Sequence, residues 1–374
     1  MKKILLATLE FPPMRGGVAE YLYGLFSALP HDRVAVLTDA AKGETPPAMY
    51  PIRHARLLGP RRLPWRWLAA LGPVVSAVRE ERAEALAVSH LLPMGYVALM
   101  LKRLWKLPYV VFTHGTDLHF AARSPWKRLC ARHVLRNADL VVANSEYTRA
   151  LAVAAGAPRE RTEVVFPCPG LGHSAMDDKA EAKRELGFDR RLVVLSVGRL
   201  ARRKGFDRMI RALFRLRKSC GDVVYLLVGS GPEREALERE AARHALKPYV
   251  MFHASVPREK LHYYFGAADA FVLPAREVAG DVEGFGIVLV EAQAHGLPIV
   301  TTRVGGIPEA VVGGATATVL SEDAGDDLLA DEVCRMLTDR TRAAAYGEAG
   351  RRRANSEFNW PKQAAKLRAR LETL

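Results

Sequence analysis

The segment LVVLSVGRLARRKGFDRMI, residues 192–210, carries the pattern that decides the fold. Its first six residues, Leu192–Val197, are apolar except for one serine, which is typical of a strand buried on both faces of a parallel sheet. A loop rich in arginine and lysine follows, and a helix is predicted from about Phe206. Strand, loop and helix in this order predict one repeating unit of an α/β fold, with the basic loop at the carboxyl end of the strand.

The same alternation of strand and helix runs along the whole chain. Helical patterns such as Gly17–Leu29 and Ser145–Ala155 separate apolar stretches of strand length. We predict strands at Ile4–Leu9, Arg33–Thr38, Ala85–Ser89, Tyr109–Thr113, Leu140–Ala143, Val164–Phe166, Leu192–Val197, Val223–Val228, Val250–His253, Ala270–Leu273, Ile299–Thr301 and Ala317–Val319.

This pattern occurs twice, so we predict two Rossmann-like, parallel-sheet domains, residues 1–168 and 169–356. The sequence PCPGLG, Pro167–Gly172, has the proline and glycine content of a connector between them. Ligands of open parallel sheets bind at the carboxyl ends of the strands, so we expect a site in a central cleft between the two domains.

Composition limits the class of protein. The chain has 374 residues, of which 49% are hydrophobic, so we expect ordered domains. The four cysteines are far apart and form no Cys-x-x-Cys pair, which argues against a zinc site and a disulfide framework and fits a reducing cytoplasm. Thr8 and Glu10 interrupt the N-terminal apolar run, which favours a buried strand over a signal peptide. The longest apolar stretch stops at Lys102, so we expect a cytoplasmic protein, either soluble or peripheral on the inner face of the cell membrane.

The net charge of +14 is concentrated in the first half, where residues 1–170 hold 23 Lys and Arg against 13 Asp and Glu. Within it, RLLGPRRLPWRWLAALG, Arg56–Gly72, mixes arginines with tryptophans. Such a segment suits an anionic membrane surface, and it is equally typical of a loop and helix with solvated arginines. The sequence has no zinc-finger, RNP or helix-turn-helix signature, so we do not expect nucleic acid as a partner.

Glycines and a histidine follow several predicted strands. Gly16 and Gly17 precede an amphipathic helix, where glycine lets the helix N-terminus approach an anion. Gly229 occupies the same position in LLVGSGPERE, and His114 follows a strand in FTHGTDL. Each signal alone is also typical of a plain turn or of a hydrogen-bonded structural histidine.

The loop of the opening segment carries Arg199 and Lys204. Arginine can bind phosphate oxygens through two parallel bonds and lysine acts as a point charge, so the pair suits a diphosphate. Arg202 and Arg203 are expected to be solvated. The alternative is a solvated basic turn.

The stretch VEGFGIVLVEAQAHGLPIV, residues 282–300, places Glu283 and Glu291 around an apolar run. Burying a carboxylate is unfavourable unless it is paired, which points to a polar ligand. A helix is predicted to begin near Phe285 or Gly286, so Glu291 is suited to ribose hydroxyls and Glu283 to sugar hydroxyls. The alternative is one surface glutamate and one capping glutamate.

In this order, the motifs resemble the retaining glycosyltransferase family 4, of GT-B fold, over nearly the whole chain. The matching motifs are GG at Gly16-Gly17, HGTD at His114–Asp117, ADLVVANSEYTR, VGRLARRKGFD, VGSGPERE, EGFGIVLVE and GGIPEAV. The C-terminal segment, residues 357–374, resembles the family's last helix, which crosses back onto the first domain. One departure is Gly172, where the family's connector often has aspartate.

The resemblance implies a nucleotide diphosphate sugar donor bound mainly by the second domain. Arg199 and Lys204 would bind the diphosphate, Glu291 the ribose, and Glu283 the sugar, together with the backbone of Phe285, Gly286 and Ile287. Val256 would face the base, Gly17, beside Gly16, would touch phosphate from the first domain, Gly229 would belong to the donor site, and His114 would lie near the sugar.

The resemblance also implies the reaction. The acceptor attacks on the face that the diphosphate leaves, a phosphate oxygen takes its proton, and stabilisation of the leaving diphosphate is the main catalytic effect. No cofactor and no metal are expected, since Arg and Lys take the metal's place. The loop Arg276–Val282 resembles mannosyl-transferring relatives of the phosphatidylinositol mannosyltransferase type, so GDP-mannose is the first candidate donor, with UDP- and ADP-sugars open.

We therefore predict transfer of a hexose to a lipid-linked or cell-envelope glycan acceptor. The alternatives are a GT-B-like nucleotide-sugar 2-epimerase, a phosphorylase, or a nucleotide- or membrane-binding module without turnover.

Overall fold

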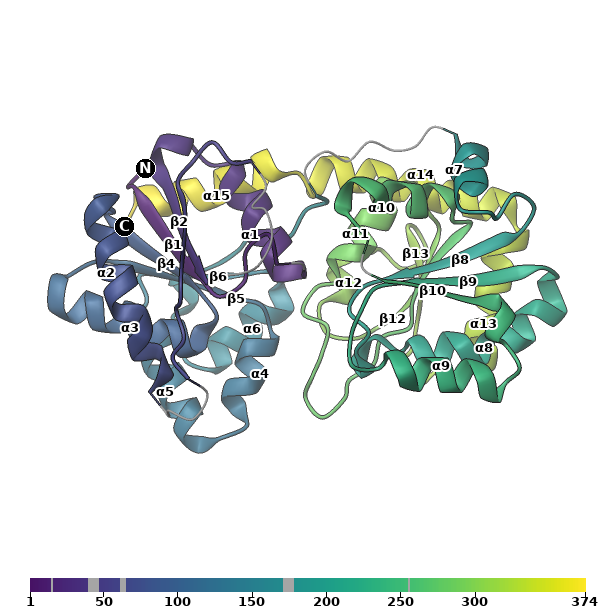
Figure 1. Ribbon diagram of the computed structural model, residues 1–374, viewed down its shortest axis with the longest axis horizontal. Helices are drawn as coiled ribbons and strands as arrows, with labels where there is room; N and C mark the ends of the chain where they lie inside the picture. The colour runs from purple at the N-terminus through teal and green to yellow at the C-terminus, as the bar shows by residue number, and fades with distance from the viewer. Residues whose placement is uncertain (15, 40–46, 61–64, 171–177, 255) are drawn as a thin grey trace. The chain divides into compact units, whose positions relative to one another are not determined.

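The structure is a computed structural model that describes residues 1–14, 16–39, 47–60, 65–170, 178–254 and 256–374. Its contacts divide the chain into two compact units, each of which is described by itself (Figure 1). Unit 1 comprises Met1–Pro167 and Trp360–Leu374, and unit 2 comprises Cys168–Asn359. The expected connector, Pro167–Gly172, is only partly covered, because Gly172 lies outside the described residues.

Unit 1 contains a seven-stranded sheet with the order β3-β2-β1-β4-β5-β6-β7, in which adjacent strands run parallel. The register places Ile4 beside Val34 and Ala85. The strands are β1 (Ile4–Thr8), β2 (Val34–Asp39), β3 (Ile52–Ala55), β4 (Ala85–Ser89), β5 (Tyr109–Thr113), β6 (Leu140–Ala143) and β7 (Thr162–Val164).

Helices cover both faces of this sheet. They are α1 (Gly17–Ser27), α2 (Leu71–Glu80), α3 (Leu91–Trp105), α4 (Thr116–Ala122), α5 (Pro125–Asn137), α6 (Glu146–Ala154) and α15 (Trp360–Glu372). On one face, Leu5 and Val88 pack in a buried cluster with Val74 of α2 and Met94 of α3. On the other, Phe26 of α1 packs against Phe112, and α1 contacts α15. Because both faces are covered, the inner strands such as β1, β4 and β5 are buried along their whole length, whereas the edge strand β3 is not.

Unit 2 contains a six-stranded parallel sheet with the order β10-β9-β8-β11-β12-β13. Its strands are β8 (Leu192–Val197), β9 (Val223–Val228), β10 (Val250–His253), β11 (Ala270–Leu273), β12 (Ile299–Thr302) and β13 (Ala317–Leu320). The order reverses between β8 and β11, and ligands of open parallel sheets bind outside the carboxyl ends of the strands at such a reversal.

Helices lie on both faces of the second sheet as well, with α8, α9 and α13 on one face and α10, α11 and α12 on the other (Figure 1). The helices are α7 (Lys179–Glu185), α8 (Phe206–Cys220), α9 (Arg234–Arg243), α10 (Arg258–Ala267), α11 (Ile287–Ala294), α12 (Ile307–Ala310), α13 (Asp326–Thr338) and α14 (Arg340–Glu357). The fold class predicted from the sequence, two Rossmann-like parallel-sheet domains, is confirmed.

One expectation from composition is wrong. The sequence argued against disulfides, whereas Cys220 at the end of α8 is bonded to Cys334 of α13, with the two Cα atoms 6.2 Å apart. The two cysteines are 114 residues apart in the sequence. They meet because α8 and α13 pack side by side, which spacing along the chain could not indicate.

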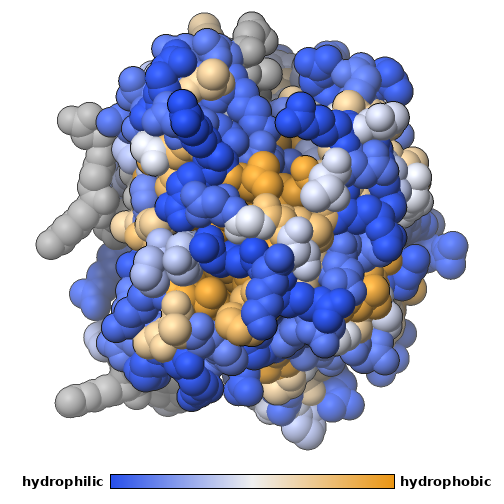
Figure 2. Space-filling model, turned by 90° about the vertical axis from the view of Figure 1, so that its right-hand side faces the viewer, coloured by the Kyte–Doolittle hydropathy of each residue, from blue (hydrophilic) through white to orange (hydrophobic). Residues whose placement is uncertain are grey.

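Among the described residues, no helix is both long enough and apolar enough to cross a membrane. Figure 2 shows one face of the molecule, on which hydrophilic residues predominate and hydrophobic residues form separate small areas.

Candidate functional site

The carboxyl end of β8 presents two cations in different environments. Arg199 is exposed, and its guanidinium has no hydrogen-bond or ion-pair partner in the described part of the chain. Lys204 ends a short 3-10 helix, Arg202–Lys204, and is only 5% exposed. The loop therefore combines one cation open to solvent with one buried beside the strand end.

Lys204 pairs with Glu283, which is 9% exposed. Lys204 Nζ lies 2.7 Å from Glu283 Oε2, and Arg203 Nε lies 3.5 Å from the same oxygen. Burial alone raises the pKa of Glu283, but the charges of Lys204 and Arg203 outweigh this effect and hold that pKa below its usual value. Glu283 is therefore ionised at neutral pH although its side chain is buried.

Arg203 was expected to be solvated, and this expectation is wrong. Its side chain is 19% exposed and contacts the carboxylates of Asp281 and Glu283. Arg202, for which the same was expected, is exposed. The sequence could not show which of the two arginines is solvated, because both lie in the same run of basic residues.

A two-glycine turn supports the backbone around Glu283. The amide of Gly306 donates to the carbonyl oxygen of Glu283, at 3.0 Å. A Cβ atom at Gly305 would lie 2.2 Å from that oxygen, and one at Gly306 would lie 2.1 Å from the carbonyl oxygen of Gly284. The motif GGIPEAV thus lets two backbone segments approach more closely than side chains allow.

The helix α11 follows directly from this segment. It begins at Ile287, with Gly286 as its N-cap in the left-handed conformation, so the predicted start was early by one or two residues. Phe285 is buried, and its ring packs against Phe358 with the centroids 5.7 Å apart. Only the backbone of Phe285 is therefore available to a ligand. Glu291, one turn into the helix, is 8% exposed.

Gly229 directly follows β9, and Val256 lies three residues after the end of the neighbouring strand β10. A Cβ atom at Gly229 would lie 1.9 Å from the carbonyl oxygen of Gly198, so glycine is required for the two strand-end loops to pack together. Val256 is partly buried, two residues before α10, and its neighbour Ser255 lies outside the described residues.

Unit 1 brings its own strand ends together. Gly16 is the N-cap of α1 and Gly17 its first residue, without a side-chain cap. His114 follows β5, and its Nε2 atom lies 2.9 Å from Ser89 Oγ. Burial lowers the pKa of His114 to about 4, so its imidazole is neutral at pH 7. The ring is therefore placed as a polar, uncharged group.

Two further residues at these strand ends were missed by the sequence reasoning. Glu10 follows β1 and His90 follows β4, and a carboxylate oxygen of Glu10 lies 3.4 Å from His90 Nε2. His90 has the left-handed φ of 72°, and its buried Nδ1 atom has no hydrogen-bond partner among the described residues. Their positions after predicted strands were the available signal, but β1 and β4 are not consecutive in the sequence, so only the sheet order brings them together.

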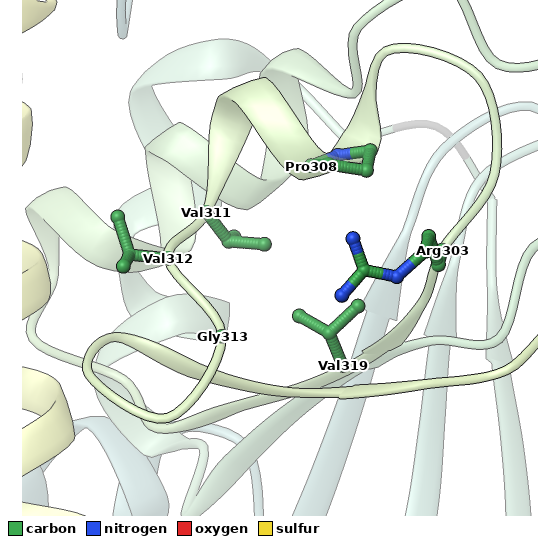
Figure 3. Close-up of a pocket in the computed structure, with 6 residues that line it drawn as sticks. All are labelled: Arg303, Pro308, Val311, Val312, Gly313 and Val319. Atoms are coloured by element: carbon green, nitrogen blue, oxygen red, sulfur yellow. The ribbon is translucent and has the colours of Figure 1, made fainter.

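A pocket lined by Arg303, Pro308, Val311, Val312, Gly313 and Val319 lies elsewhere in unit 2. Figure 3 shows the guanidinium of Arg303 directed toward the side chains of Val311 and Val319. The volume of this pocket, about 170 Å³, is below the several hundred Å³ of ordinary ligand sites. None of the predicted site residues lines it, so we do not assign it to the candidate site.

Within the part of the chain that the structure describes, no group of three or more His, Cys, Asp or Glu side chains is arranged to hold a metal ion.

Family comparisons match almost the whole chain. Residues 16–168 match the glycosyl transferase 4-like domain, and residues 178–353 match glycosyl transferases group 1. The chain is 34% identical to the GDP-mannose-dependent alpha-(1-6)-phosphatidylinositol monomannoside mannosyltransferase of Mycolicibacterium smegmatis, over 97% of both chains. It is 30% identical to the D-inositol 3-phosphate glycosyltransferase of Corynebacterium jeikeium, over 85% of this chain and 79% of that one.

The fold matches as well. The structure of Anabaena HepE in complex with UDP and glucose superposes with a TM-score of 0.83 at 22% identity, over the full length of both chains. The fold is therefore GT-B, as predicted. The chain belongs to the glycosyltransferases of family 4, and it is an enzyme of the transferase class. These matches give no support to the 2-epimerase alternative.

Proposed function

We propose that this glycosyltransferase moves mannose from GDP-mannose to a lipid-linked acceptor, with retention at the anomeric carbon. The observation that carries the proposal is the buried Lys204–Glu283 pair at the carboxyl ends of the unit 2 sheet, beside the exposed Arg199. The donor and the acceptor class are those named for relatives up to 34% identical to this chain.

The two cations suit a diphosphate. Arg199 is exposed at the strand end and can engage phosphate oxygens in a bidentate way. Lys204 adds a buried charge, which interacts more strongly with developing negative charge than it would in water. Together they stabilise the leaving diphosphate, which is the main demand of a reaction without an enzymic nucleophile.

The carboxylates suit hydroxyl groups. Glu283 is ionised, buried and fixed by the Gly305-Gly306 turn, so it accepts hydrogen bonds from the hydroxyls of the donor sugar. Glu291 would accept hydrogen bonds from the ribose hydroxyls. The backbone of Phe285 through Ile287 and the N-terminus of α11 complete the sugar and phosphate contacts. In unit 1, the neutral His114 is a hydrogen-bonding group that adds no positive charge.

The reaction needs no metal in this scheme. Arg199 and Lys204 supply the charge that a divalent cation provides in other transferases, and the phosphate oxygen takes the proton of the attacking hydroxyl. Metal independence is an expectation that the binding and transfer measurements test with EDTA.

A lipid acceptor requires access to a membrane, and unit 1 offers a suitable surface, which we call the α3–α5 surface. It comprises the exposed apolar residues Leu104, Trp105, Phe120, Trp126 and Leu129. The stretch that contains them, residues 91–138, has eight Lys and Arg and one acidic residue. Exposed apolar side chains among positive charges favour binding to anionic lipid headgroups.

We propose that this surface docks on the cytoplasmic face of the membrane. The segment Arg56–Gly72 contributes the exposed Trp65 and Leu68, while Arg61 and Arg62 of that segment lie outside the described residues. No nucleic acid partner is part of the proposal.

The donor is tested by thermal unfolding with GDP-mannose, UDP-glucose and ADP-glucose, each with and without EDTA. A ligand at about 100 times its dissociation constant stabilises the folded state by roughly 2.7 kcal/mol. We expect a shift of the melting temperature with GDP-mannose alone, unaffected by EDTA and lost in Glu291→Ala. A shift with another nucleotide would replace the donor, and a shift that EDTA abolishes would overturn metal independence.

A further inference from the structure

The Glu283 carboxylate is held by more positive charge than one lysine supplies. Lys204 Nζ lies 2.7 Å and Arg203 Nε 3.5 Å from Glu283 Oε2. Asp281 faces the other side of the same guanidinium, with its Oδ2 atom 3.4 Å from Arg203 Nη1. Among the described residues, Lys204 and Arg203 are the cations that lie within 4 Å of the Glu283 or Asp281 carboxylate.

The Lys204 ammonium has two partners, the donor diphosphate and Glu283, and it cannot fully pair with both at once. In the proposed function its ammonium binds the donor diphosphate, whereas in the structure it neutralises Glu283. If Lys204 moves toward the phosphate, Glu283 remains buried at 9% exposure with less compensating charge. A buried carboxylate without a partner is strongly unfavourable, so a second cation is needed at that moment.

Arg203 meets this need because it is fixed from three sides. Its guanidinium contacts Asp281 and Glu283, and its carbonyl oxygen accepts a hydrogen bond of 2.8 Å from the amide of Arg276. The planar guanidinium presents its N–H donors in a fixed fork, so it can contact two carboxylates at once without moving. The Gly305-Gly306 turn, also packed here, offers the amide of Gly306 to the Glu283 carbonyl.

We propose that Arg203 is a positioning residue that holds the Glu283 carboxylate in place for the donor sugar when Lys204 turns to the diphosphate. This inference rests on the proposed function, and it assigns a role to Arg203, a residue of the motif VGRLARRKGFD for which the family resemblance implies none. Arg203 itself does not contact the donor: it acts through Glu283.

The test compares the binding of GDP and of GDP-mannose by Arg203→Met, Arg203→Lys and the control Arg202→Met. Arg202 is the neighbouring arginine of the same loop, but it is exposed. We expect Arg203→Met to weaken the binding of GDP-mannose and kcat/KM by roughly ten- to hundredfold, because the buried Glu283 carboxylate loses one of its two cationic partners. GDP binding should fall less than GDP-mannose binding, since GDP carries the diphosphate that draws Lys204 away but lacks the mannose that Glu283 binds.

Arg203→Lys keeps the charge and should recover part of the loss, and Arg202→Met should behave as the wild type. The acid side of the kcat/KM profile should move to higher pH in Arg203→Met alone, because removing a positive charge raises the pKa of Glu283. If Arg203 had a purely structural role, the acid side of the kcat/KM profile would stay at the same pH.

Three results would overturn the inference. The first is an Arg203→Met variant with wild-type affinity for GDP-mannose. The second is an equal loss of GDP and GDP-mannose binding, which would assign Arg203 to the phosphates or to folding. The third is wild-type protein that binds neither ligand, which would remove the proposed function itself. If Arg203→Met does not fold, as judged by its melting curve, the comparison of Arg203→Lys with the wild type decides in the same way.

Discussion

At the scale of single residues, His114 shows how the fold sets the chemistry of a side chain. Burial at the end of β5 lowers the pKa of His114 to about 4, against the partly opposing effects of Asp117 and Glu10. The folded protein therefore binds fewer protons at this position than the unfolded chain between pH 6.5 and about 4. Stability from the neutral imidazole is complete above pH 6.5 and falls as the pH drops through this window.

This predicts a pH dependence that His114→Gln should flatten. In denaturant unfolding between pH 4 and 7.5, the wild-type free energy of unfolding should fall on acidification by up to roughly 3 kcal/mol more than that of the variant. The exposed His54 provides the control, and His54→Gln should keep the wild-type slope. Parallel curves for wild type and His114→Gln would show that His114 is not held neutral by the fold.

The residue scale also shows where sequence reasoning ends. Lys204 could be singled out from its basic loop after a predicted strand, and Glu283 from the position of its carboxylate beside an apolar run. Their contact at 2.7 Å, and the part that Arg203 takes in it, depend on the Asp281 loop lying beside the β8 loop. The same holds for Glu10 and His90, which the sheet order brings together.

At the scale of elements, the Gly305-Gly306 turn explains why the motif GGIPEAV accompanies the motif EGFGIVLVE. It packs on the backbone of Glu283 and Gly284, where an added Cβ atom would overlap a carbonyl oxygen. The turn between β12 and α12 therefore fixes the segment that precedes α11. The sequence identified GGIPEAV as a family motif but gave no physical reason for it.

We predict that Gly306→Ala displaces the Glu283 segment. Its Cβ atom would lie 2.1 Å from the Gly284 oxygen, a backbone atom that cannot rotate away. The affinity for GDP-mannose should drop by more than about tenfold, measured by titration calorimetry, with a smaller effect on GDP. The control is Gly313→Ala, where the nearest atom would be a Val319 methyl at 3.5 Å, an ordinary contact. Equal behaviour of the two variants would contradict this account of the turn.

Most elements could be predicted from the sequence, because strands that are buried on both faces read as continuous apolar runs. One exception is β3, Ile52–Ala55, an edge strand whose sequence IRHA is largely exposed and so carries no such run. The other is β7, also an edge strand, which was predicted at Val164–Phe166 and lies at Thr162–Val164. The Cys220–Cys334 bond was missed for a related reason, since it depends on the packing of two helices rather than on local pattern.

At the scale of the whole molecule, the net charge is +14, and the sequence places most of the excess of Lys and Arg in residues 1–170. The arginine- and tryptophan-containing segment Arg56–Gly72 drew attention in the sequence. The structure adds the α3–α5 surface, where α3 contacts α5 and α5 contacts α4. On it Trp126 is 70% and Leu129 60% exposed, although both lie in a helix with a buried side.

We predict that Trp126→Ser with Leu129→Ser weakens membrane binding. Sedimentation with phosphatidylglycerol vesicles should show partitioning reduced by about tenfold or more, because two apolar side chains no longer enter the interface. Binding of the wild type should fall with added salt. Phe214 of α8, 50% exposed in unit 2, serves as control, and Phe214→Ser should leave partitioning unchanged. Unchanged partitioning of the double variant would exclude this surface.

The proposed reaction of the whole enzyme can be tested in a single transfer experiment. The protein is incubated with GDP-mannose and phosphatidylinositol monomannoside in the presence of EDTA, and the product is analysed by NMR for its anomeric configuration. We expect an α-linked mannosyl product, formed without added metal and lost in Glu283→Gln. A β-linked product would contradict retention, and the absence of transfer by protein that binds GDP-mannose would contradict the proposed acceptor class.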